Sequence, residues 1–238
     1  MCNLCEDGRI GRRDVLRFGV AAGLVAMGFG GAGAARAAEA PKALTPDEAL
    51  AALKEGNARY VAKPELCVLD LNEARKSVAG GQAPWATVIA CADSRVPPEL
   101  IFGGRGVGEL FVARNAGSLA SAATLGTVEY GAAVLGSPVI VVLAHSACGA
   151  VKAACDVVTA NATYPGAIGP MIEPIVPAAL AVRDQPGDFT DNAAAESARR
   201  TAGRLAESDP LLAGRVNDGT LKIVPAMYDL QTGVVNWL

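Results

Sequence analysis

Two uninterrupted apolar runs dominate the hydrophobic pattern of this chain. One is "WATVIAC" at residues 85–91, and the other is "PVIVVLAH" at residues 138–145. Neither run alternates between apolar and polar positions, which is typical of strands buried on both faces of a parallel sheet. A further strand is predicted at "ELFVARNAG", residues 109–117. The pattern therefore predicts an α/β protein whose central, mostly parallel sheet is flanked by helices.

Apolar residues at helical spacing fill much of the rest of the chain. Thr45 is the predicted N-cap of the first helix. Helices are expected at residues 44–62, 118–136, 148–159 and 191–219, the last as one helix or two, with a short helix within residues 63–84. Residues 162–181 are punctuated by proline and glycine and predict a loop that leads into a helix. The C-terminal segment predicts a strand, a turn at residues 231–233 and a short final strand.

The N-terminus has the pattern of an export signal rather than of a folded element. Arg12 and Arg13 precede an apolar stretch at residues 15–35, and "ARA" at residues 35–37, with small residues at its first and third positions, is the predicted cleavage site. The arginine pair resembles a twin-arginine signal, which predicts an exported, periplasmic protein. An uncleaved anchor helix is the alternative. We expect a signal at residues 1–37 and one catalytic domain at residues 38–238, without stable membrane association after cleavage.

Composition narrows the choice of partners. Hydrophobic residues make up 51% of the chain but aromatic residues only 5%, so small side chains are expected to pack the interior. The formal net charge is −3 and no basic stripe is present, which argues against nucleic acid as a partner. Cys2 and Cys5 lie within the predicted signal, whereas four of the six cysteines lie beyond it.

Polar side chains gather where the apolar runs end. Cys91, Asp93 and Arg95 follow the first run, and His145 and Cys148 follow the second. Carboxyl ends of parallel strands meet at one edge of a sheet, so these residues are expected in one crevice. Two cysteines and a histidine suit zinc and leave a fourth position for water. Zinc lowers the pKa of that water toward ~7, which supplies a hydroxide nucleophile.

Asp93 and Arg95 extend this hypothesis, because an arginine fork can hold a carboxylate ionised beside the metal. Several alternatives stay open at this point. The cysteines and the histidine could be core residues, or a structural zinc could take Cys67 or Cys155 as its fourth ligand. Asp93 and Arg95 could form a surface ion pair. A cysteine nucleophile with His145 as its base is a further alternative.

The motifs "CADSRV" and "HSACG", in which 54 residues separate Cys91 from His145, together resemble the β-class carbonic anhydrases. The resemblance extends over residues 45–238 and implies a lyase that reversibly hydrates CO2 to bicarbonate and a proton. It implies one Zn²⁺ per chain, with Cys91, His145 and Cys148 as metal ligands. Asp93 and Arg95 would form a dyad that orients the zinc-bound hydroxide.

The resemblance also implies a substrate pocket. It assigns Gln82 as an amide donor to substrate, and Phe111 and Tyr130 as walls of an apolar CO2 pocket. In the family some of these walls come from a partner subunit, so a homodimer or higher homo-oligomer is expected. Two other functions remain: hydrolysis of carbonyl sulfide or CS2 at the same zinc site, and a non-catalytic zinc-holding scaffold.

Overall fold

The computed structural model describes residues 43–63, 71–104, 106–207 and 211–238. The predicted export signal at residues 1–37 lies outside the described residues, so the division of the chain at residue 37 stays a prediction. In the described part of the chain, no helix is both long enough and apolar enough to cross a membrane.

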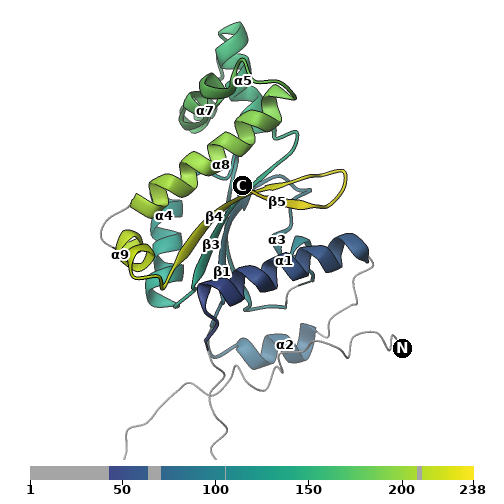
Figure 1. The fold of residues 1–238 in the computed structure, drawn as a ribbon, viewed down its shortest axis with the longest axis vertical. Coiled ribbons are helices and arrows are strands. Elements are labelled where there is room, and N and C mark those ends of the chain that lie inside the picture. The colour runs from purple at the N-terminus through teal and green to yellow at the C-terminus, as the bar shows by residue number, and fades with distance from the viewer. Residues whose placement is uncertain (1–42, 64–70, 105, 208–210) are drawn as a thin grey trace, which may run out of the picture.

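A five-stranded sheet in the order β2-β1-β3-β4-β5 forms the centre of the protein (Figure 1). The strands are β1 (Ala86–Cys91), β2 (Leu110–Asn115), β3 (Val139–His145), β4 (Lys222–Tyr228) and β5 (Val235–Trp237). The first four are parallel, and β5 runs antiparallel to β4. The predicted α/β class, the buried strands and the C-terminal strand–turn–strand are confirmed.

Helices cover both faces of this sheet. They are α1 (Pro46–Ala62), α2 (Leu71–Val78), α3 (Pro98–Ile101), α4 (Ala122–Glu129), α5 (Gly149–Ala160), α6 (Ile168–Ile172), α7 (Val176–Val182), α8 (Phe189–Glu207) and α9 (Leu211–Asn217), with a π-helix η1 (Tyr130–Val134) and a 3-10 helix η2 (Glu173–Ile175). In Figure 1, α4, α8 and α9 lie on one side of the sheet, and α1 and α3 lie on the other.

Alternation along β3 explains why its sequence is apolar throughout. Ile140 and Val142 face the core beneath α5, α7 and α8. Val139, Val141 and Leu143 face a second core, to which α1 and α3 contribute. Because successive side chains of a strand point to opposite faces, a strand between two cores must be apolar at every position. Packing on both faces holds the strands in place, and the polar residues at the strand ends are positioned with them.

Helix α1 begins as the sequence predicts. The Thr45 side chain accepts a hydrogen bond from the Glu48 backbone, and the Glu48 carboxylate accepts one from the Thr45 N–H, which is a complete capping box. Farther along, the buried Asn57 amide donates to the carbonyls of Ile101 and Gly233, and its oxygen accepts from the Val235 N–H. This one side chain joins α1 to α3 and to the C-terminal hairpin.

Two predicted segments differ from the structure. The helix expected at residues 118–136 begins only at Ala122, with Ser121 as its N-cap, and continues as the π-helix. Residues 162–181 are not mainly a loop but contain α6, η2 and α7. Pro174 and Pro177 occupy first-turn positions of η2 and α7, where proline loses no helical hydrogen bond. The prolines therefore start new short helices instead of excluding helix.

Candidate metal centre

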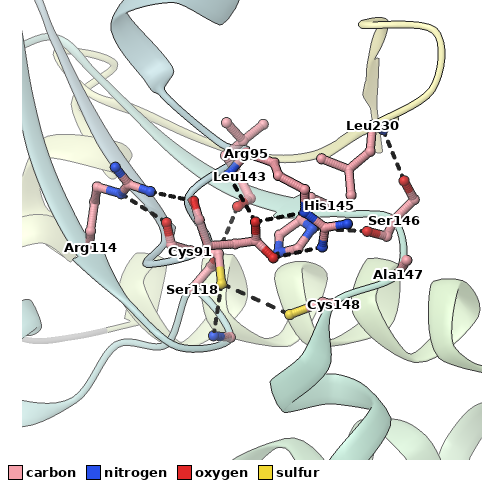
Figure 2. Close-up of polar contacts among 12 residues, drawn as sticks. Cys91, Arg95, Arg114, Ser118, Leu143, His145, Ser146, Ala147, Cys148 and Leu230 are labelled. Carbon is pink, nitrogen blue, oxygen red and sulfur yellow. Dashed lines mark hydrogen bonds and ion pairs between the residues drawn. The ribbon is translucent and has the colours of Figure 1, made fainter.

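Cys91, His145 and Cys148 meet at the carboxyl edge of the sheet (Figure 2). Cys91 ends β1, His145 ends β3, and Cys148 is the N-cap of α5. Because β1 and β3 are adjacent and parallel, their ends coincide. The three ligand atoms all lie within 4.8 Å of one another, and all three residues are buried. The structure thus brings together the ligand set predicted from the sequence.

The donor atoms of this cluster fit a tetrahedral metal ion. The two sulfur atoms are 4.0 Å apart, close to the ~3.8 Å expected for two thiolates on tetrahedral zinc at ~2.3 Å. His145 Nδ1 lies 2.9 Å from the Ser146 carbonyl oxygen. His145 Nε2 is buried and has no hydrogen-bond partner among the described residues. A ring that donates through Nδ1 presents the Nε2 lone pair to a metal.

The thiols also show that the cluster is suited to a cation. A hydrogen bond from the Cys148 thiol, together with the neighbouring His145 ring and the Gly117 N–H, lowers the pKa of Cys91 to about 4. The neighbouring Cys91 sulfur, together with burial, raises the pKa of Cys148. The protein alone therefore stabilises one negative charge in this cluster, and a second thiolate needs a positive ion.

Cys155 is not a fourth ligand. It is a free, buried cysteine farther along α5, and it does not belong to the cluster of possible metal ligands. Burial raises the pKa of its thiol, which is typical of a core residue. Cys67 lies outside the described residues. The described side chains therefore supply three ligands, the number that catalytic zinc sites use.

Asp93 and Arg95 form a two-pronged ion pair beside the cluster. Arg95 Nε lies 2.9 Å from Asp93 Oδ1, and Arg95 Nη2 lies 2.7 Å from Oδ2. The hydrogen bonds from the Arg95 side chain hold the pKa of Asp93 well below its usual range. Asp93 Oδ2 is also 3.9 Å from His145 Nε2. This ion pair therefore places an ionised acceptor at the edge of the cluster.

Arg114, which was not among the predicted site residues, supports the same loop. Its Nε donates to the Cys91 carbonyl at 2.8 Å, and its Nη2 donates to the Asp93 carbonyl at 2.6 Å. Arg114 lies on β2 opposite Ala90 of β1. A charged residue near the end of a strand that neighbours the ligand-bearing strand is the signal that could have identified it.

Gly117 fits closely against the Cys91 side of the centre. Its N–H donates to Cys91 Sγ at 3.5 Å, and its backbone has a φ of +85°. A Cβ atom at this position would lie 2.8 Å from Cδ1 of Ile175. The backbone conformation therefore favours glycine here, and an added methyl group would also force the end of the buried Ile175 side chain to move.

Replacing Gly117 with alanine is expected to destabilise the fold by about 1–3 kcal/mol, because the methyl group is both strained and crowded. The same change should weaken metal binding through Cys91. Urea unfolding and competition with a chelator measure the two effects. Gly126→Ala is the control, because Gly126 lies within α4 and a Cβ there meets no atom within 4 Å. Equal stability of both variants would contradict this account.

The three residues predicted to form the substrate pocket, Gln82, Phe111 and Tyr130, lie away from the metal cluster of their own chain. Phe111 pairs in register with Thr87, four residues before Cys91, which corresponds to about 13 Å along the strand. Tyr130 contacts Phe111 with ring centroids 6.2 Å apart and is 49% exposed. Gln82 is exposed and precedes β1. None of them joins the described metal cluster of its own chain, so their roles stay predictions.

A buried Cys2His cluster at the edge of a parallel sheet, with an ionised carboxylate beside it, defines a metal-binding α/β protein. Comparison with known proteins makes the class specific. The carbonic anhydrase family model matches residues 86–235. Carbonic anhydrase 2 of Mycobacterium tuberculosis is 36% identical over 188 residues, which cover 79% of this chain and 90% of the relative.

Two further comparisons agree with this class. The carbonic anhydrase of Mycolicibacterium smegmatis is 37% identical over 190 residues, covering 80% of this chain and 92% of the relative. The structure of the Coccomyxa β-carbonic anhydrase in complex with acetazolamide aligns with a TM-score of 0.61 at 27% identity, over 70% of this chain and 77% of that chain. The chain belongs to the β-carbonic anhydrase family.

Proposed function

We propose that the protein catalyses the reversible hydration of CO2 to bicarbonate and a proton. The observation that carries this proposal is the buried Cys91–His145–Cys148 cluster with the Asp93 carboxylate at its edge. One Zn²⁺ per chain would be held by these three residues. When bound, zinc supplies a hydroxide nucleophile near neutral pH.

The residues of the chain have separate tasks in this reaction. Asp93 accepts a hydrogen bond from the attacking water and fixes the direction of its lone pair. Arg95 keeps Asp93 ionised and in place through the two contacts at 2.9 and 2.7 Å. Arg114 holds the backbone that carries both Cys91 and Asp93. A nucleophile held in the correct direction reacts faster because its orientational freedom is already lost.

The substrate pocket is proposed to form between two subunits. CO2 is apolar and requires an apolar slot, but Phe111 and Tyr130 lie at the far end of β1 from their own cluster. Tyr130 and Val134 of the π-helix are 49% and 64% exposed and lie four residues apart. A homodimer that covers this surface would bring Gln82, Phe111 and Tyr130 of one subunit toward the metal centre of the other.

Replacing Val134 with glutamate is expected to shift the assembly toward monomers, because it places a charge in an apolar contact. Activity should fall with the loss of the dimer. Sedimentation velocity measures the mass, with Leu180→Glu on α7 as the control, because Leu180 is also exposed, at 56%. An unchanged mass together with unchanged activity would argue against this interface.

Stopped-flow measurement of CO2 hydration by protein with a determined zinc content tests the proposed reaction. Fast hydration at about one zinc per chain supports it. Carbonyl sulfide and CS2 are measured alongside, because they are linear, apolar substrates with similar demands on a pocket. Preferred turnover of either one, or zinc without any turnover, would overturn the assignment.

Export by a twin-arginine signal is proposed from the sequence of residues 1–37. Arg12, Arg13 and the apolar stretch that follows support it, as does the small-residue site at Ala35–Ala37. N-terminal sequencing of the protein from a periplasmic fraction tests the proposal. A mature chain that still begins at Met1 would contradict it.

A further inference from the structure

Two of the three metal ligands lie in one tight turn, and this turn contains an unusual backbone conformation. His145 and Cys148 are separated by Ser146 and Ala147. Ala147 has a φ of +52°, which is unfavourable for a residue with a Cβ atom. The turn therefore needs support from outside to keep this shape, and the shape decides how the His145 and Cys148 side chains face each other.

One side of the turn is fixed to the sheet. The Ser146 N–H donates to the Tyr228 carbonyl at the end of β4, at 2.9 Å. The Ser146 hydroxyl oxygen accepts from the Leu230 N–H, also at 2.9 Å. Both contacts are made by Ser146 and neither by Ala147 itself, and Figure 2 shows the one with Leu230.

The other side of the turn is held by a carboxylate of α8. Asp191 Oδ1 accepts a hydrogen bond from the Ala147 N–H at 2.8 Å, across 44 residues of sequence. Asp191 is half-buried, and it is the acidic residue in the first turn of α8. Its contact lies on the residue whose φ is positive, midway between the two ligands.

The position of Asp191 in its own helix is informative. Asp188 accepts the Asp191 N–H at 2.8 Å, as an N-cap side chain does. In a capping box a glutamate or glutamine three positions after the cap bonds back to the backbone N–H of the cap. Asp191 Oδ1 instead bonds to Ala147. Its carboxylate supports the metal-ligand turn rather than its own helix.

We propose that Asp191 is a positioning residue of the metal centre. Its carboxylate holds Ala147 in the left-handed conformation and thereby sets the relative placement of His145 Nε2 and Cys148 Sγ. This inference rests on the proposed zinc site. Residues that orient metal ligands affect metal affinity and the geometry of coordination without touching the metal.

Asp191→Ala is tested against Asp191→Asn and Asp188→Ala. Asparagine keeps an acceptor oxygen, and Asp188→Ala removes a cap of α8 without touching the turn. Zinc affinity is measured by chelator competition, and the visible spectrum of the Co²⁺-substituted protein reports the coordination geometry. We expect Asp191→Ala to raise the zinc dissociation constant about 10-fold or more and to change the cobalt spectrum. Asp191→Asn should stay near the wild type, and Asp188→Ala should change only the unfolding midpoint.

A second substitution tests the backbone part of the inference. Glycine adopts a positive φ without steric cost, so Ala147→Gly in the Asp191→Ala background should restore part of the zinc affinity. This double variant also carries the test if Asp191→Ala alone does not fold. Wild-type zinc affinity and an unchanged cobalt spectrum in Asp191→Ala would overturn the role of Asp191. Wild-type protein that shows no tetrahedral cobalt spectrum would instead overturn the proposed zinc site itself.

Discussion

Replacing Asp93 with alanine is expected to lower kcat for CO2 hydration by about 100-fold or more while the protein keeps one zinc per chain. The ligand atoms of Cys91, His145 and Cys148 remain in place, so metal binding should survive. The lost element is the acceptor that directs the nucleophile from the edge of the cluster, where Asp93 Oδ2 lies 3.9 Å from His145 Nε2. Stopped-flow kinetics and metal analysis on the same sample measure both quantities.

The pH dependence of this loss follows from the ionisation of Asp93. Arg95 holds the pKa of the carboxyl well below its usual range, so Asp93 is ionised at every pH near neutrality. The ratio of wild-type to variant activity should therefore be constant between about pH 6 and pH 9. Asp156→Ala is the control, because Asp156 forms an exposed ion pair with Lys152 on α5. An Asp93→Ala enzyme with full zinc and wild-type kcat would exclude the proposed role of the dyad.

Removal of the metal is expected to have the largest effect of all, a loss of at least about 1000-fold, because metal ions contribute several kcal/mol to such transition states. Dipicolinate should reduce hydration to the rate of the buffer, and added zinc should restore it. The metal-free protein should also unfold at a lower temperature, because a bound ion stabilises only the folded state.

Two cysteine variants give this experiment a matched pair. Cys148→Ser should lose zinc and activity together, whereas Cys155→Ser should keep both, because Cys155 is a buried thiol outside the cluster. Activity that survives complete zinc removal would instead favour the cysteine nucleophile with His145 as its base. Zinc removal therefore distinguishes a zinc mechanism from a cysteine-nucleophile mechanism that would use the same side chains.

The strands and the metal ligands were predictable because their signals are local. β1 and β3 are apolar at every position, and a parallel pairing of two such strands brings Cys91 to the pair formed by His145 and Cys148. The N-cap at Thr45 follows from three adjacent side chains in the same way. These features depend on short stretches of sequence and on the rule that the carboxyl ends of parallel strands meet at one edge of a sheet.

The supporting contacts were not predictable because they join distant segments. Arg114 reaches the Cys91 loop from β2, and Asp191 reaches Ala147 from α8. The position of Arg114 near the end of β2 indicates that it lies close to the centre but not which carbonyls it contacts. Nothing in the residues around Asp191 indicates its contact with Ala147. The close approach of Gly117 to Ile175 likewise exists only once η2 has packed. The metal ligands of the centre are therefore predictable from the sequence, whereas most of the contacts that hold them in position are not.

The split of the ligands between β1 and β3 has a consequence for how the protein matures. Of the three ligands, only His145 and Cys148 are close together in the unfolded chain. Cys91 joins them when β1 and β3 pair across the intervening β2 and α4. Pairing of this kind requires closure of a long loop and is slow compared with local helix formation. The time at which tight zinc binding appears during refolding would therefore report when the central sheet has assembled.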